Sequence, residues 1–294
     1  MTLDEEFAAP SHTAASPTAL PRTAMIGVGS MGGAILSGLR APEVRIERPI
    51  AVTTRSAASA EQFAGADDVA AYAAETDPEA NRHAVRGARV VVLGVKPWMI
   101  LDVARGIADA LEPGAIVVSV AAGVPSREIE AVLPEGVVVV RAMPNTPSTI
   151  GRGVTGVAGG ASADAESVEL VRRLFETVGE AIVVSEDQIK DIAAVSGSGP
   201  AYLYFYAEQM IAAAERLGFD ADQSRMLVQQ TIAGAAELML RSDKEAAELR
   251  RNVTSPKGTT EQAIGVLESA DWGDLFDRAL AANVRRSEEM ERGE

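Results

Sequence analysis

The chain has 294 residues, of which 47% are hydrophobic, and its formal charge at pH 7 is −15. This length exceeds the usual size of one domain and the apolar content is ample for packed cores, so two domains are expected. A negative surface repels nucleic-acid backbones and anionic lipid, and neither is expected as a partner. The absence of cysteine excludes disulfides, thiolate nucleophiles and cysteine-bound zinc, and it fits a reducing cytoplasm.

The first 22 residues are acidic at the start and then rich in Ala, Ser, Thr and Pro. They lack the basic and apolar regions of a signal peptide, so residues 1–22 are interpreted as a disordered leader. No apolar stretch elsewhere is both long enough and uncharged enough to cross a bilayer. The expected location is therefore the cytoplasm, with no membrane contact.

Short apolar runs separated by helix-length segments begin at residue 23. Runs such as Val90–Leu93 do not alternate with polar residues, which is typical of strands covered on both faces of a parallel sheet. The pattern predicts a doubly wound α/β domain over residues 23–185. Its expected strands are Thr23–Val28, Ile50–Thr53, Arg89–Val95, Ile116–Val120, Val137–Ala142, Val154–Val157 and Ile182–Val184.

The strand signals stop near Asp187, and residues 186–294 are predicted to form a second, all-helical domain. The expected helices are Asp187–Val195, Pro200–Leu217, Asp220–Arg241, Ser242–Asn252, Thr260–Leu267 and Asp271–Glu291.

A glycine-rich turn, Gly27-Val28-Gly29-Ser30-Met31-Gly32, lies between the first expected strand and a helical pattern over residues 31–39. This spacing lets the backbone turn tightly and approach a pyrophosphate, whose charge then lies on free N–H groups at the helix start. Ordinary strand-to-helix turns also produce the pattern. Its place at the first βα junction of a doubly wound sheet favours a dinucleotide-binding, Rossmann-type domain.

The end of the second expected strand bears on the choice of dinucleotide. An acidic residue there suits the ribose 2′-OH of NAD, whereas a basic residue suits the 2′-phosphate of NADP. The run Val52-Thr53-Thr54-Arg55-Ser56 has hydroxyls, an arginine and no carboxylate. NADP(H) is therefore favoured, unless Arg55 is an ordinary solvated cation.

Other catalytic chemistry has little support in the sequence. His12 lies in the leader and His83 is interpreted as a surface helix residue, so a histidine-based dehydrogenase is poorly supported. No group of His, Cys and Asp has the spacing of metal ligands, and no metal is expected. A protonated imine is a suitable substrate, because its carbon is already electrophilic and needs little help from a proton relay.

A second anion site is predicted in the run Asn252 to Thr260, NVTSPKGTT. Thr259 with Gln262 has the form of a capping box, so a helix is expected to begin there with hydroxyls and N–H groups directed at one spot. A carboxylate fits that spot. A plain capped helix after a proline turn would give the same pattern.

Together these features resemble the pyrroline-5-carboxylate reductase family from residue 24 to about residue 268. The most specific segments are Met143–Pro147 (MPNTP), Ser196–Tyr202 (SGSGPAY) and Thr254–Thr260, in this order. The resemblance implies reduction of 1-pyrroline-5-carboxylate to L-proline, the last step of proline biosynthesis. NADPH is the expected cofactor, with NADH as an alternative. A homodimer with interleaved helical domains is implied, with further assembly into a ring of dimers left open.

The resemblance also assigns roles to individual residues. Thr260 is expected to orient the imine or donate its proton. The implied substrate-binding residues are Ser255, Gly258, Thr259, Thr260 and Glu186. The implied cofactor-binding residues are Ile26, Gly27, Val28, Gly29, Ser30, Met31, Thr54, Arg55, Asn81, Gly94, Val95, Lys96, Pro97, Ala121, Ala122 and Asn252.

One position departs from the family pattern, which usually reads Ser-Pro-Gly-Gly where this chain has Ser255-Pro256-Lys257-Gly258. If the replaced glycine has a positive φ, lysine there costs about 1 kcal/mol or more of strain, and its ammonium lies near the anion site. The alternative is that Lys257 points to solvent and changes nothing.

Two other functions remain open. One is a related imine or β-hydroxyacid reductase, which would normally use a catalytic lysine; Lys190 and Lys244 are the only helical candidates in the second domain. The other is a catalytically silent dinucleotide sensor. The aromatic stretch Tyr202–Tyr206 is interpreted as core and dimer interface rather than as a binding box for bases.

Overall fold

The computed structural model describes residues 19–293. These residues form two compact units, one made of residues 19–200 with 280–293 and the other of Ala201–Ala279. Residues 1–18 of the expected leader lie outside the described residues. Leu20 is buried, and its N–H donates to the carbonyl of Arg45 at 2.8 Å. The folded part of the chain therefore includes Leu20, which the sequence analysis had assigned to the leader of residues 1–22.

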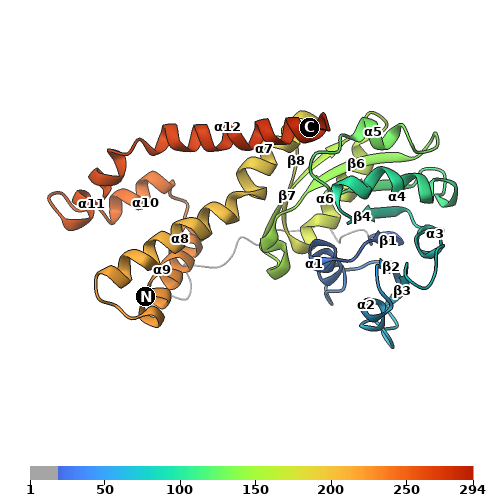
Figure 1. The fold of residues 1–294 in the computed structure, drawn as a ribbon, viewed down its shortest axis with the longest axis horizontal. Coiled ribbons are helices and arrows are strands. Elements are labelled where there is room, and N and C mark those ends of the chain that lie inside the picture. The colour runs from blue at the N-terminus through green and yellow to red at the C-terminus, as the bar shows by residue number, and fades with distance from the viewer. Residues whose placement is uncertain (1–18, 294) are drawn as a thin grey trace. The chain divides into compact units, whose positions relative to one another are not determined.

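The first unit is built on an eight-stranded sheet in the order β3-β2-β1-β4-β5-β6-β7-β8 (Figure 1). All neighbouring strands are parallel except the β6–β7 pair. The predicted doubly wound Rossmann-type fold is confirmed. The strands are β1 Thr23–Ile26, β2 Ile50–Thr54, β3 Val69–Ala73, β4 Val90–Leu93, β5 Ile116–Ser119, β6 Val138–Met143, β7 Gly153–Gly159 and β8 Gly179–Val183.

Helices cover both faces of this sheet. Val90 and Val92 of β4 belong to the core cluster formed with α1 and α6, whereas Val91 and Leu93 belong to the cluster formed with α3, α4 and α5. This double burial explains why the run has no polar alternation. The helices of this unit are α1 Ser30–Leu39, α2 Ala57–Glu61, α3 Ala80–Val85, α4 Ile100–Ile107, α5 Ser126–Glu130, α6 Ala165–Phe175 and α7 Ile189–Ile192, and a π-helical turn, Ala193–Gly197, follows α7.

Two features of the sheet differ from the prediction. Strand β3 has the sequence VAAYA, and alanine is depleted in strands, so no strand was expected there. It forms by pairing along its whole length with β2. Strands β6 and β7 are antiparallel because the connection between them, residues 144–152, is shorter than the crossover that parallel neighbours require.

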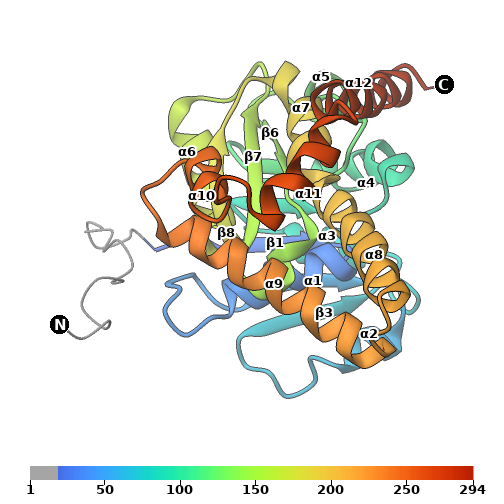
Figure 2. The ribbon, with the colours of Figure 1, turned by 90° about the vertical axis from the view of Figure 1, so that its left-hand side faces the viewer.

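The second unit is helical, as predicted, and a short turn at residues 217–220 joins α8 to α9 in it (Figure 2). Helix α9 begins with a capping box, in which the Asp220 carboxylate accepts the N–H of Gln223 and the Gln223 side chain accepts that of Asp220. Helix α12 starts in this unit and ends in the first. The helices are α8 Gly199–Arg216, α9 Ala221–Arg241, α10 Ala246–Asn252, α11 Thr259–Glu268 and α12 Trp272–Glu291.

The second unit has almost no core of its own. Within residues 201–279 only Ser224 and Val228 are buried, while Tyr204 and Phe205 of α8 are 63% and 62% exposed. Contiguous exposed apolar surface of this kind marks a protein–protein interface. In the described part of the chain, no helix has both the length and the apolar character that crossing a bilayer requires.

Candidate active site

The glycine turn lies at the carboxyl edge of the sheet, between β1 and β4. The strand order reverses there, and open α/β sheets bind their ligands in the crevice at such a point. Gly27 has a φ of +85°, which glycine adopts without steric cost. Its N–H lies 3.1 Å from the hydroxyl and 3.2 Å from the carbonyl oxygen of Thr53. The end of β2 therefore holds the turn in place.

Packing requires two further glycines at this edge. A Cβ atom on Gly94 would lie 2.8 Å from the carbonyl oxygen of Gly27, and one on Gly32 would lie 2.9 Å from the same atom. Both separations are shorter than Cβ contacts in real proteins. A Cβ on Gly29, by contrast, would meet nothing within 4 Å. The space beside Gly29 is therefore open to a ligand.

The start of α1 is suited to an anion. Its N-cap is Gly29, no side chain caps it, and its first turn has no acidic residue. The first amides of a helix lack intrahelical acceptors, and the helix dipole adds positive potential there. This geometry suits a pyrophosphate. Binding of the pyrophosphate stays a prediction for the residues that form the turn and the helix start: Ile26, Gly27, Val28, Gly29, Ser30 and Met31.

At the end of β2, the predicted ribose residues differ in exposure. Thr54 is buried, and its hydroxyl donates to the carbonyl of Ser56 at 2.9 Å, so it shapes the loop. Arg55 is exposed and extends from the same loop. Of the two, Arg55 has the charge that can bind a 2′-phosphate.

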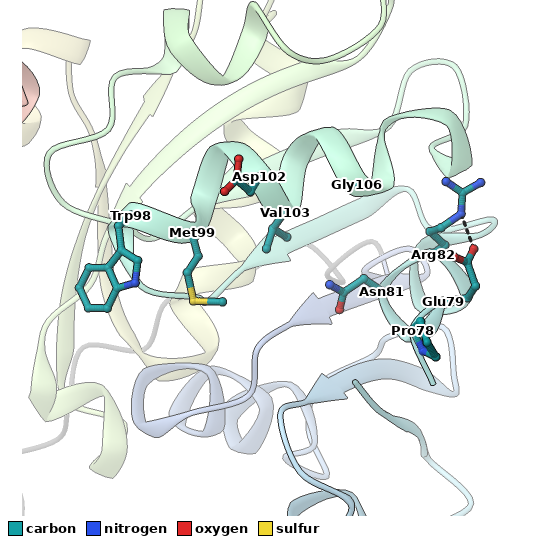
Figure 3. A pocket seen from close by; sticks show the side chains of 9 residues that line it. All are labelled: Pro78, Glu79, Asn81, Arg82, Trp98, Met99, Asp102, Val103 and Gly106. Atoms are coloured by element: carbon teal, nitrogen blue, oxygen red, sulfur yellow. Dashed lines mark ion pairs between the residues drawn. The ribbon is translucent and has the colours of Figure 1, made fainter. Parts of the chain in front are cut away.

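A hollow of about 510 Å³ lies between α3 and the start of α4 (Figure 3). Asn81, expected near the adenosine, lines it. Gly94, Val95 and Lys96 connect β4 to the 3₁₀ turn Pro97–Met99, which with α4 forms the other wall. Trp98 also lines this hollow and is 77% exposed. The sequence did not indicate it, because Trp98 is not part of a motif with defined residue spacing. The lining residues are Pro78, Glu79, Asn81, Arg82, Trp98, Met99, Asp102, Val103 and Gly106.

The loop after β5 contains the predicted residues Ala121 and Ala122. It turns at Gly123, which has a φ of +72° and where a Cβ would lie 2.9 Å from the Cβ of Met290. The last turn of α12 therefore packs directly on this loop.

Glu186 has two partners within the first unit. Its Oε1 atom accepts the N–H of Ser126 at 2.9 Å and a hydrogen bond from Arg141 at 3.0 Å. The Arg141 side chain is only 3% exposed, so Glu186 neutralises a buried charge. Its Oε2 atom is buried without a partner among the described residues. The part expected for Glu186 in substrate binding stays a prediction.

The predicted anion loop of the second unit has a different helix start from the expected one. Gly258 is the N-cap and Thr259 the first helical residue, so the predicted capping box of Thr259 and Gln262 is wrong. A capping box needs the hydroxyl at the N-cap itself. Instead, the Glu261 carboxylate accepts the N–H of Lys257 at 2.8 Å.

This start changes which donors the loop offers. The N–H of Gly258 donates to the carbonyl of Ser255 at 2.9 Å and is used in the turn. The N–H groups of Thr259 and Thr260 are at the start of α11, where intrahelical acceptors are lacking. Ser255, Thr259 and Thr260 are all exposed, and Asn252 is the last residue of α10. One turn thus groups three hydroxyls and two amide donors.

Comparisons with known proteins decide the family. Residues 186–290 match the model "Pyrroline-5-carboxylate reductase dimerisation", and residues 22–123 match "NADP oxidoreductase coenzyme F420-dependent". The pyrroline-5-carboxylate reductase of Pseudomonas aeruginosa is 41% identical over 92% of this chain and 97% of its own length. The chain belongs to the pyrroline-5-carboxylate reductase family. The pyrroline-5-carboxylate reductase of Corynebacterium melassecola is 38% identical over 91% of this chain and 97% of its own length.

Solved structures agree with this assignment. A pyrroline-5-carboxylate reductase from Coxiella burnetii is 40% identical, has a TM-score of 0.83, and covers 92% of this chain and 98% of its own. The Plasmodium falciparum enzyme, solved with NADP bound, is 24% identical with a TM-score of 0.76 and shares the fold. The dimerisation model covers the unit with the exposed apolar surface, which indicates a homo-oligomer.

Lys190, a candidate catalytic lysine for the alternative reductases, forms an ion pair in this chain. Its Nζ lies 2.7 Å from Oε1 of Glu288. The hydrogen bond to Glu288 raises the pKa of Lys190 above its usual range, so its ammonium stays protonated. Among residues 19–293, no three His, Cys, Asp or Glu side chains group as they would to hold a metal ion.

Lys257 has a φ of +62°, so the condition for strain at this departure from the family pattern is met. We expect Lys257→Gly to raise the free energy of unfolding by about 1 kcal/mol, because relief of the left-handed strain outweighs the added freedom of the unfolded glycine. Urea unfolding measures this change. Lys257→Ala is the control, since it removes the charge and keeps the strain; equal stabilisation by alanine would contradict the explanation.

Proposed function

We propose that this reductase converts 1-pyrroline-5-carboxylate to L-proline with NADPH as the hydride donor. The observation that carries the proposal is the cradle around Gly29, left open by the chain while Gly27, Gly32 and Gly94 are closely packed. It occurs in a chain 41% identical to a named pyrroline-5-carboxylate reductase. The preference for NADPH over NADH rests on Arg55 and on the lack of an acidic residue at the end of β2.

In the proposed complex the dinucleotide supplies a hydride, and the chain supplies its binding surfaces. The amides at the start of α1 bind the pyrophosphate. Arg55 binds the 2′-phosphate, and Asn81 lies on the adenosine side. Gly94, Val95, Lys96 and Pro97, with Ala121, Ala122 and Asn252, border the route to the nicotinamide.

The substrate is held by the loop before α11. Ser255 and the amide of Thr259 bind its carboxylate, and Gly258 lets the turn close rather than donating to the substrate. The hydroxyl of Thr260 donates a hydrogen bond to the lone pair of the neutral ring nitrogen, which orients the imine and passes a proton to the nitrogen as the hydride adds to the imine carbon. The family resemblance places Glu186 near the substrate pocket. Addition of hydride to the imine carbon then gives the amine of proline.

The proposed assembly is a homodimer. A unit in which only two residues are buried is completed by a second copy, since apolar burial is the main favourable term in folding. Mass in solution decides whether dimers assemble into rings. We place the enzyme in the cytoplasm, where a chain without cysteine needs no oxidising environment.

Thr260→Ala tests the catalytic assignment. We expect kcat to fall about 100-fold, because a positioned proton donor or hydrogen bond to the reacting nitrogen is lost. The dissociation constant of NADPH should stay within about twofold, since the cofactor does not depend on this hydroxyl. Turnover is followed by NADPH absorbance with pyrroline-5-carboxylate, a piperideine carboxylate and a 2-oxo acid.

Thr260→Ser is the matched control, because it keeps the hydroxyl and should recover most of the rate. Unchanged turnover in the alanine variant would refute the role of Thr260. A wild-type chain that prefers the piperideine or the 2-oxo acid would refute the substrate. NADPH binding without turnover on any of them would indicate a dinucleotide sensor.

A further inference from the structure

A carboxylate reaches the proposed ribose loop from the neighbouring strand. Glu75 lies two residues after the end of β3, and its N–H donates to the carbonyl of Arg55 at 3.1 Å. Its carboxylate accepts the N–H of Ala57 at 2.9 Å. The N–H of Ala74 also donates to the carbonyl of Thr54 at 2.9 Å. Backbone and side-chain bonds therefore both hold Glu75 against residues 54–57.

The hydrogen-bond partner of this carboxylate is a backbone amide and not a basic side chain. Two other acids of the same segment have side-chain partners, since Asp77 lies 2.9 Å from the His83 ring nitrogen and Glu79 lies 2.7 Å from Arg82. The bond of Glu75 to Ala57 is to a neutral backbone amide. A negative charge thus remains beside Arg55, in a loop that must accept the strongly negative 2′-phosphate of NADPH.

We propose that Glu75 is a specificity-determining residue that limits the preference for NADPH over NADH. Its carboxylate repels a 2′-phosphate and withholds the Ala57 amide from it, while it can accept the 2′-OH of NADH as an acidic residue at the end of β2 does in other Rossmann domains. The inference rests on the proposed function of Arg55 in binding the ribose phosphate. Arg55 then raises the preference for NADPH over NADH, and Glu75 lowers it.

The test is Glu75→Gln, because glutamine keeps an oxygen that accepts the Ala57 N–H and loses only the charge. Binding of ADP-ribose and of its 2′-phosphorylated form is measured by calorimetric titration, and binding of NADH and NADPH alongside. We expect the ratio of affinities, 2′-phosphorylated ligand over its unphosphorylated counterpart, to rise about tenfold in the variant compared with the wild type. Removal of one nearby surface charge predicts a change of this size. The gain should shrink at high salt.

Glu61→Gln is the matched control: it removes the same charge from the exposed last residue of α2 and should leave the binding ratio within about twofold. An unchanged ratio in Glu75→Gln, or an equal change in Glu61→Gln, would overturn the role of Glu75. Neither result contradicts the proposed reduction of pyrroline-5-carboxylate. That reaction fails instead if the wild-type chain does not reduce pyrroline-5-carboxylate, and the binding comparison is readable even then.

Discussion

Gly29→Ala should weaken NADPH binding about 100-fold and leave the stability of the fold nearly unchanged. Gly29 has a φ of −96° and a ψ of −151°, an extended conformation outside the positive-φ region that favours glycine. The new methyl group meets no atom of the chain within 4 Å, so it stands in the space assigned to the pyrophosphate. Overpacking of a close contact costs about 1–3 kcal/mol, and the upper part of that range corresponds to about a hundredfold loss of affinity.

Gly32→Ala is the matched comparison for this prediction. Its Cβ would lie 2.9 Å from the carbonyl oxygen of Gly27, so this variant should lose about 1–3 kcal/mol of stability and bind the cofactor poorly as well. Calorimetric titration with NADPH and urea unfolding separate the two cases. Wild-type affinity in a folded Gly29→Ala variant would show that the pyrophosphate does not lie beside this turn.

Phe205→Glu should convert the proposed homodimer to monomers. Phe205 is 62% exposed in a single chain, on the unit that the family's dimerisation model covers. Burying a phenylalanine contributes about 1.5–3 kcal/mol, and two-fold symmetry counts it twice. Burying a carboxylate in its place costs still more. The dissociation constant of the dimer should therefore rise about 1,000-fold or more.

Sedimentation velocity over a range of protein concentrations measures this change. Ile150→Glu is the control, because Ile150 is 75% exposed but lies outside the dimerisation model. It should leave the mass in solution unchanged. A Phe205→Glu chain that stays dimeric at low concentration would place the interface on another surface of the helical unit.

The sequence predicted those elements whose signals are local. Strands such as Val90–Leu93 are runs of apolar, largely β-branched residues, which favour buried strands in most surroundings. The turn at Gly27 was predictable because a positive φ and close backbone approach both require glycine. The family motifs were equally visible in the sequence, but the hydrogen bonds that their residues form were not. Asn145 of the MPNTP motif donates to the carbonyl of Ser196 and accepts the N–H of Val154, across 51 and 9 residues of sequence.

The sequence alone therefore determined the fold class, the place of the dinucleotide turn and the family, since each depends on sterics or spacing within a short segment. The tertiary structure alone decided that the alanine-rich β3 is a strand, that Gly258 rather than Thr259 caps α11, and that Glu75 meets Arg55. These outcomes depend on which segments lie side by side. Pairing and packing supply free energy that no single segment contains, so a local pattern cannot predict them.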